Sequence, residues 1–186
     1  MRAQRPGESA LLLLDAVDVL NDAAISYAVI GAMAASVHGV VRASLDADAV
    51  LALPVNRLRE LERRFIDAGF RAELRTGDED DPIAAVLGLT DPFGNRVDLL
   101  VGLRGLEPAA FSRAFEVPFQ GKTLRVIGLE DFVAMKLFAH GPQDIEDARF
   151  AIANTGGKLD LDLLRRLTAR YGPEAVETLM KVLSRT

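Results

Sequence analysis

Cysteine is absent from the sequence. Its absence excludes disulfide bonds, thiol catalysis and zinc sites built on cysteine. A chain without cysteine fits a reducing compartment, and we expect a cytoplasmic protein.

Long hydrophobic runs are absent as well. No unbroken apolar run exceeds the five residues from Ala10 to Leu14. A membrane-spanning helix needs roughly 20 apolar residues. The first residues, "MRAQRPGES", contain no apolar signal core either. We therefore expect a protein with no membrane partner.

The chain also lacks an excess of positive charge. Its formal net charge is −5 at pH 7, which argues against binding nucleic acid through the overall electrostatic field. At 186 residues with 49% hydrophobic residues, it is long enough to bury a sizeable core. We expect a core over residues 1–127, including an N-terminal helix, and a helical C-terminal segment over residues 128–186 that packs on it.

Helical and strand-like patterns alternate in the first two thirds of the chain and predict an α+β fold. Ser9 is placed as the N-cap of the first helix, and Pro54 suits the first turn of a later one, whose apolar positions include Ile66. The helical patterns cover residues 9–23, 32–38, 54–69, 129–140, 142–154, 160–172 and 173–185. The strand patterns cover residues 26–31, 45–53, 70–74, 83–90 and 95–102, with a hairpin in 116–128.

Two aspartates interrupt the apolar strand pattern "LDADAVLAL". Alternate residues of a strand project from one face, so Asp46 and Asp48 lie side by side. Adjacent carboxylates repel each other unless water or a cation lies beside them. The pair therefore indicates either a divalent-metal site or the wet polar face of an exposed edge strand.

Two further features accompany this pair. Gly31 and Ala32 end one strand and begin a helix, where backbone N–H groups can receive a phosphate. Asp98, in "NRVDLLV", is another carboxylate inside an apolar strand. From its pattern alone, Asp98 is either a metal ligand or a cross-strand partner of Arg96 or Arg42.

The segment "YAVIGAMAASVHGVVRASLDADAVLAL" resembles the core motif of the nucleotidyltransferase superfamily, a glycine with glycine or serine after it, followed by Asp-x-Asp on the next strand. The subgroup it most resembles is the AbiEii/AbiGii toxin-like and minimal nucleotidyltransferases. There an Arg-x-Ser leads into the Asp-x-Asp, matched here by Arg42 and Ser44. A later lysine with spaced aspartates is matched by Lys136, Asp144 and Asp147.

The resemblance implies a nucleotidyltransferase-like mixed sheet flanked by helices. It implies that Asp46, Asp48 and Asp98 form a catalytic triad holding Mg²⁺ or Mn²⁺. Metals held in this way can assist an in-line displacement that moves a nucleoside monophosphate from a nucleoside triphosphate to an acceptor. The acceptor would be a tRNA, a protein or a small molecule.

The resemblance also assigns nucleotide-binding roles to Gly31, Ala32, Arg42, Ser44 and Lys136. Asp144 or Asp147 would orient Lys136 or touch the acceptor, although all three could equally be charges on a helix surface. Ala32 departs from the family pattern, because serine or a second glycine is usual there. Alanine removes a hydroxyl contact to phosphate but keeps the backbone N–H.

Two other functions remain open. The chain could be a catalytically weak or inactive nucleotidyltransferase-like protein that binds a partner protein in a toxin–antitoxin-type pair. "DADAVL" also fits the start of haloacid-dehalogenase-type phosphatases, in which the first aspartate is the nucleophile. That motif ordinarily closes an apolar run, whereas "VRAS" precedes it here.

Overall fold

Apolar residues at alternate positions build the central sheet of the protein. In β5, Val97, Leu99 and Val101 are buried, while Asp98 and Leu100 between them are half-buried. The same alternation in β4 buries Leu87 and Leu89. Each of these strands therefore presents one apolar and one more polar face.

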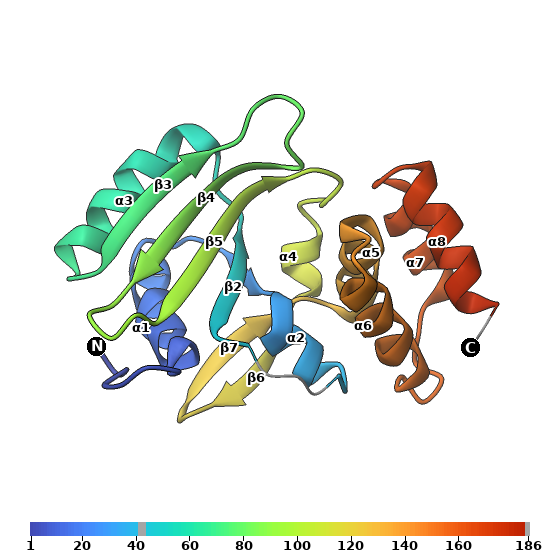
Figure 1. Cartoon of the computed structure of the whole chain (residues 1–186), viewed down its shortest axis with the longest axis horizontal. Coiled ribbons are helices and arrows are strands. Elements are labelled where there is room, and N and C mark those ends of the chain that lie inside the picture. The colour runs from blue at the N-terminus through green and yellow to red at the C-terminus, as the bar shows by residue number, and fades with distance from the viewer. Residues whose placement is uncertain (41–43, 185–186) are drawn as a thin grey trace.

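A computed structural model describes residues 1–40 and 44–184 (Figure 1). Seven strands form one mixed sheet in the order β3-β4-β5-β2-β1-β7-β6. The strands are β1 Tyr27–Val29, β2 Asp46–Leu51, β3 Arg71–Thr76, β4 Ile83–Thr90, β5 Arg96–Leu103, β6 Phe115–Phe119 and β7 Lys122–Val126. The pairs β2–β5 and β1–β7 are parallel and the remaining pairs antiparallel. The expected mixed sheet flanked by helices is confirmed.

Helices α1 and α3 cover one face of the sheet. The helices are α1 Ser9–Asp22, α2 Gly31–Val37, α3 Leu58–Asp67, α4 Ala110–Arg113, α5 Leu129–Ala139, α6 Pro142–Ala153, α7 Leu161–Ala169 and α8 Pro173–Leu183, with a 3-10 turn at Val55–Arg57. Helix α1 contacts β2, β5 and β7, and α3 contacts β3 and β4. They bury Leu12, Leu13 and Leu20 of α1 and Leu58 and Phe65 of α3.

The opposite side of β3, β4, β5 and β2 carries polar side chains, and we call it the open face. Its members follow from the strand register, because residues directly opposite each other share a face. They include Arg71, Glu73, Arg75, Gly88, Thr90, Arg96, Asp98, Asp46 and Asp48.

Helices α5 to α8 follow the last strand and gather on one side of the molecule (Figure 1). Strand β7 ends at Val126 and α5 begins at Leu129. A division of the chain at residue 127 into core and helical segment stays a prediction. Among the described residues, no helix combines the length and apolar character needed to cross a membrane.

Two local predictions were wrong, and one short helix was missed. Glu8, not Ser9, is the N-cap of α1. The Ser9 hydroxyl instead donates to the carbonyl oxygen of Leu45 and accepts from the Arg96 backbone N–H at 3.0 Å, so it joins α1 to the sheet. Ile66 is 52% exposed rather than on the apolar face of α3. The short helix α4 was not predicted, because four residues are too few to show a helical period.

Candidate functional site

The strand register brings two of the predicted carboxylates face to face. Strands β2 and β5 are parallel neighbours, with Asp48 directly opposite Asp98 and Asp46 opposite Arg96. All three aspartates therefore project from the open face. Strand β2 lies between β5 and β1, so the alternative in which the Asp-x-Asp pair sits on an edge strand was wrong.

Gly31 lies directly against Asp48. It is the first residue of α2, with a φ of +62°. A Cβ at this position would collide with Asp48 Oδ2 and lie 3.1 Å from its Cγ. The Ile30 backbone N–H also donates to the Asp48 carbonyl oxygen at 2.9 Å. Glycine is thus required here by both the left-handed backbone and the close approach.

Two arginines contact Asp98. The distance from Arg96 Nη2 to Asp98 Oδ2 is 2.9 Å, and from Arg96 Nε to Asp98 Oδ1 it is 3.2 Å. Arg75 Nη2 lies 3.4 Å from Asp98 Oδ1. The hydrogen bonds and charge of Asp98, with smaller contributions from Asp46 and Asp48, raise the pKa of Arg96. Arg96 is thus an ion-pair partner of Asp98, but from the same strand, two residues away, and the partner from another strand is Arg75 of β3. Arg42 lies outside the described residues.

The open face fits a cation only in part. Asp48 and Asp98 face each other, which suits a divalent ion bridging two carboxylates. Within residues 1–40 and 44–184, however, no three His, Cys, Asp or Glu side chains are grouped closely enough to hold a metal. The metal triad of Asp46, Asp48 and Asp98 stays a prediction.

A hollow of about 260 Å³ lies beside Asp46. Its lining includes Ala32 and Ser36 of α2 together with Ser9, Ser44 and Asp46. The Ser44 hydroxyl donates to the Asp46 carbonyl oxygen at 3.0 Å, which holds the chain at the start of β2. The structure thus brings the predicted residues Ala32 and Ser44 next to Asp46.

Lys136 of α5 forms a separate cluster with α6. Its Nζ lies 2.7 Å from Asp144 Oδ1 and 2.8 Å from Asp147 Oδ2. The Lys136 side chain is 11% exposed and that of Asp147 is 0% exposed, so these are not solvated charges on a helix surface. Gln143 Nε2 also donates to Asp147 Oδ1 at 3.0 Å. The predicted association of Lys136 with both aspartates is present, whereas its role toward nucleotide is untested.

Sequence reasoning missed Arg75 and used Arg96 only as an alternative partner of Asp98. A signal was available in both cases. Arg71, Glu73 and Arg75 alternate in β3, and Arg96 precedes Asp98 by two residues in β5. Period-two charges indicate a polar face, but the pairing of β3 with β4, and of β4 with β5, was needed to place Arg75 beside Asp98.

Comparison with known proteins gives similarity at the level of structure. No protein-family model matches the sequence, and no curated protein matches it. The solution structure of the antibiotic-resistance factor ANT(2'')-Ia is similar, with 16% identity, 94% of each chain covered and a TM-score of 0.57. Its crystal structure with adenylyl-2''-tobramycin is 17% identical, covering 87% of this chain and 98% of that chain, with a TM-score of 0.57.

A third similar structure is an antigenic nucleotidyltransferase-like protein from Paracoccidioides brasiliensis. It is 14% identical, covers 98% of this chain and 91% of that chain, and has a TM-score of 0.55. Identities this low bear on the fold and do not test the AbiEii-like subgroup. The chain has the nucleotidyltransferase fold.

Proposed function

We propose that this protein is a nucleotidyltransferase that moves a nucleoside monophosphate from a nucleoside triphosphate to a hydroxyl group of an acceptor. One observation carries the proposal: on this fold, Asp48 and Asp98 face each other from adjacent parallel strands, and Gly31 lies against Asp48. Two carboxylates that face each other from adjacent strands are oxygen ligands that a divalent cation can bridge. Such a cation would supply the charge stabilisation that transfer of a nucleoside monophosphate requires.

The proposed reaction is an in-line displacement. The acceptor oxygen forms a bond to the α-phosphorus, the bond from that phosphorus to the bridging oxygen breaks, and pyrophosphate leaves with the electron pair. Asp98, beside the attacking oxygen, accepts the hydroxyl proton or orients it toward water. A bound Mg²⁺ or Mn²⁺, held by Asp48 and Asp98 with Asp46 as a further ligand, would supply charge stabilisation.

The remaining predicted residues would position the nucleotide. Backbone N–H groups at Gly31 and Ala32 have no partner within the first turn of a helix and can donate to phosphate oxygens. Lys136 would meet phosphate as a point charge, held ready by Asp144 and Asp147. The acceptor class is a separate question, because the similar structures differ in what they bind. ANT(2'')-Ia was crystallised with adenylyl-2''-tobramycin, and another similar structure, 12% identical, is the lincosamide antibiotic adenylyltransferase LnuA with lincomycin bound.

A labelling experiment tests the proposal. The protein is incubated with Mn²⁺, a cell extract and each radiolabelled nucleoside triphosphate in turn. We expect one fraction of the extract to take up label, and Asp48→Asn to abolish the uptake. Asp162→Asn is the matched control, because the Asp162 side chain is 98% exposed on α7. Equal labelling by Asp48→Asn and the native protein would contradict the assignment.

A non-catalytic, partner-binding function is the second candidate, and the ion pair from Arg96 to Asp98 favours it. The pair occupies carboxylate oxygens that a metal would need. If partner binding is the whole function, replacing Asp48 and Asp98 by asparagine leaves biological activity intact. The phosphatase alternative loses support, because Asp46 opens β2 and the apolar residues come after it.

A further inference from the structure

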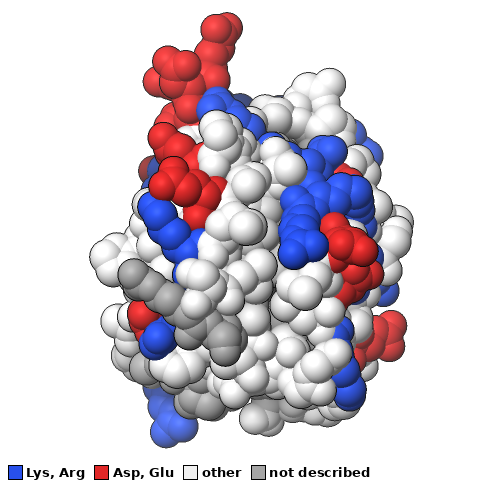
Figure 2. All heavy atoms as spheres, turned by 90° about the vertical axis from the view of Figure 1, so that its right-hand side faces the viewer, with Lys and Arg blue, Asp and Glu red and all other residues white. Residues whose placement is uncertain are grey.

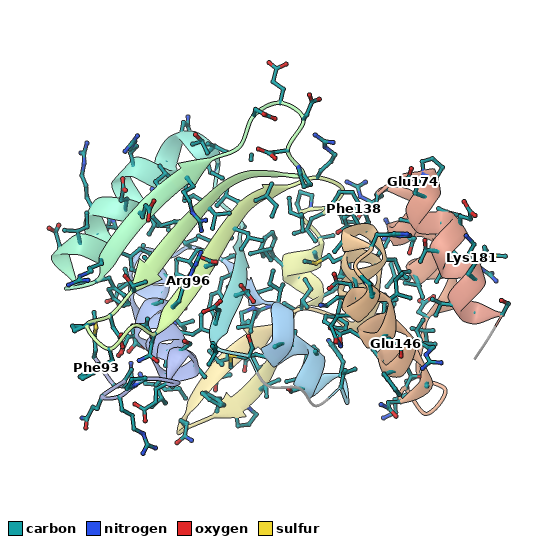
Figure 3. All side chains as sticks on the ribbon, in the orientation of Figure 1. Phe93, Arg96, Phe138, Glu146, Glu174 and Lys181 are labelled. Carbon is teal, nitrogen blue, oxygen red and sulfur yellow. The ribbon has the colours of Figure 1, made fainter. Side chains whose placement is uncertain are left out.

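A second hollow lies on the open face, over β3, β4 and β5. It measures about 330 Å³, and its lining includes Arg71, Glu73, Arg75, Gly88, Thr90 and Arg96. Arg96 projects into this region from β5 (Figure 3). Three arginines and one glutamate thus surround a concave site of the size that small ligands occupy.

The hollow adjoins the proposed reacting group. Gly88 of β4 is directly opposite Asp98 of β5. A Cβ at Gly88 would lie 3.3 Å from Asp98 Oδ1 and 3.7 Å from Arg75 Nη2. The missing side chain therefore leaves the floor of the hollow open beside Asp98. The Asp98 carboxylate therefore borders the space that a ligand in the hollow would occupy.

Two of the three arginines of the hollow, Arg71 and Arg75, are poorly neutralised, whereas Arg96 is paired with Asp98. Arg71 forms no ion pair with any residue in the described part of the chain, and Arg75 forms one, the 3.4 Å contact with Asp98. The side chains of Arg75 and Arg96 are 52% and 40% exposed. Charged residues also protect edge strands such as β3 from pairing with other chains. These arginines, however, project from the face of the sheet rather than its rim, and they converge with Arg96 from a different strand.

We propose that this hollow binds a phosphate group of the acceptor, so that the acceptor is a small phosphorylated hydroxyl compound. The inference rests on the proposed nucleotidyl transfer, because it places the phosphate beside the hydroxyl that attacks. Arginine guanidinium groups suit phosphate oxygens, with which they form paired, charge-assisted hydrogen bonds. A polycationic acceptor would meet repulsion from three arginines. The net charge of −5 disfavours a long nucleic acid.

Phosphate binding is measured without catalysis. The native protein is titrated with inorganic phosphate at constant ionic strength, and its melting temperature is followed. We expect a saturable rise, since a ligand of the folded state stabilises it by mass action. The double variant Arg71→Gln/Arg75→Gln should bind phosphate about tenfold more weakly or worse. Arg59→Gln/Arg63→Gln on α3 removes the same charge elsewhere and should bind phosphate like the native protein.

Other outcomes overturn the inference. No saturable shift in the native protein, or an equal shift in Arg71→Gln/Arg75→Gln, would show that the hollow is not a phosphate site. Each variant's melting temperature without phosphate verifies that it is folded. Asp48→Asn should bind phosphate normally while losing label transfer, so failure of the transfer reaction and failure of phosphate binding are read separately.

Ribose 5-phosphate and a short RNA oligonucleotide distinguish a small phosphorylated acceptor from a nucleic-acid end. Ribose 5-phosphate should bind through Arg71 and Arg75, and ribose should not bind. Arginine-dependent binding of a short RNA oligonucleotide with a free 3′-hydroxyl, without binding of ribose 5-phosphate, would overturn the small-molecule assignment in favour of a nucleic-acid end.

Discussion

At the residue scale, Gly31 is constrained both by its backbone conformation and by its close approach to Asp48. Two independent constraints act on this glycine. Its φ of +62° disfavours any side chain, and the Asp48 carboxylate fills the place of a Cβ. The same residue thus begins α2 and leaves room for a carboxylate of the site.

Replacing Gly31 by alanine should destabilise the fold by more than the backbone strain alone. A left-handed alanine costs roughly 1–2 kcal/mol, and displacing Asp48 adds to that cost. Gly121→Ala is the control, because Gly121 has a φ of +74° and nothing within 4 Å of an added Cβ. Urea unfolding of both variants measures the difference. Equal losses of stability in Gly31→Ala and Gly121→Ala would mean that the Asp48 side chain moves aside without an energetic cost.

In the proposed reaction, Arg96 and a metal ion would compete for the Asp98 carboxylate. Arg96→Gln removes a positive charge that contacts Asp98 and influences Asp46 and Asp48. We expect Mn²⁺ to bind the variant about tenfold more tightly, a gain of about 1.4 kcal/mol. Electron paramagnetic resonance of free Mn²⁺ measures this without substrate. Unchanged or weaker binding would show that Mn²⁺ does not use Asp98.

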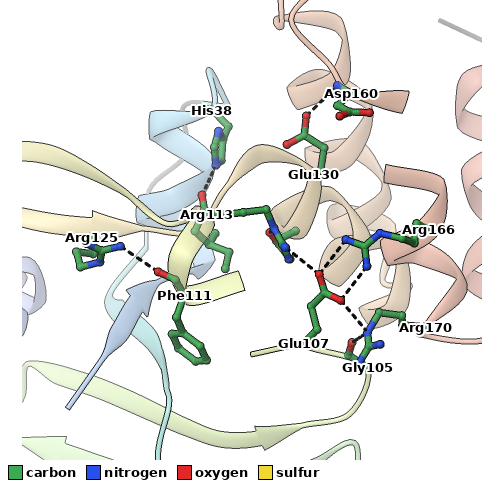
Figure 4. Close-up of polar contacts among 12 residues, drawn as sticks. His38, Gly105, Glu107, Phe111, Arg113, Arg125, Glu130, Asp160, Arg166 and Arg170 are labelled. Atoms are coloured by element: carbon green, nitrogen blue, oxygen red, sulfur yellow. Dashed lines mark hydrogen bonds and ion pairs between the residues drawn. The ribbon is translucent and has the colours of Figure 1, made fainter. Parts of the chain in front are cut away.

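At the scale of elements, a charged network joins the C-terminal helices to the sheet. Glu107, in the segment between β5 and α4, contacts Arg113 Nη1 at 2.8 Å and Arg166 Nη1 of α7 at 2.8 Å (Figure 4). Arg113 in turn contacts Asp131 of α5 at 2.7 Å. Residues 107, 113, 131 and 166 therefore link α5 and α7 to α4 and the segment before it.

This network should make stability depend on acid pH. Hydrogen bonds from Arg166 and Arg113 lower the pKa of Glu107 from 4.5 to about 2. A lowered carboxyl pKa stabilises the fold above pH 4.5, and this contribution is lost as the pH falls toward 2. Glu107→Gln should cost roughly 2 kcal/mol at pH 7, and its difference from the native protein should shrink below pH 4.5.

Denaturant unfolding at several pH values checks the Glu107 prediction. Glu60→Gln on the exposed face of α3 is the control, since the side chain of Glu60 is 51% exposed and its ion pairs with arginine lie in solvent. A pH-independent difference between Glu107→Gln and the native protein would mean that packing rather than charge holds α7.

At the scale of the whole molecule, charge is mixed rather than segregated. Acidic and basic side chains are interspersed on the face shown in Figure 2, which is the side of the C-terminal helices. The overall charge of −5 is thus compatible with local sites of either sign. The open face provides both, with carboxylates on β2 and β5 and arginines on β3 and β5.

Metal and nucleotide together should stabilise the whole fold. Mn²⁺ with a nucleoside triphosphate should raise the melting temperature, by about 2.7 kcal/mol of stability at one hundred times the dissociation constant. Asp46→Asn should abolish this shift, while Asp162→Asn should keep it. An equal shift in Asp46→Asn would place the bound ions elsewhere.

By itself, the sequence determined most of the elements and the carboxylate-bearing strands. The strand patterns over residues 45–53, 83–90 and 95–102 identified β2, β4 and β5, and the hairpin predicted in 116–128 corresponds to β6 and β7. These signals are local, because side-chain periodicity and turn chemistry depend on residues close in the chain. The resemblance carried by Gly31, Asp46 and Asp48 led to the fold that the structural comparisons support.

Only the tertiary structure decided which groups meet. Arg75 reaches Asp98 only because β3, β4 and β5 pair in this order, and Ser9 bonds to Leu45 only because α1 packs on the sheet. The burial of Lys136 between two aspartates depends on how α5 packs against α6. Strand order and register place residues dozens of positions apart on one face, and a shift of one residue would reverse that face. No local pattern contains this information, so the arginine-lined hollow became visible only in the folded chain.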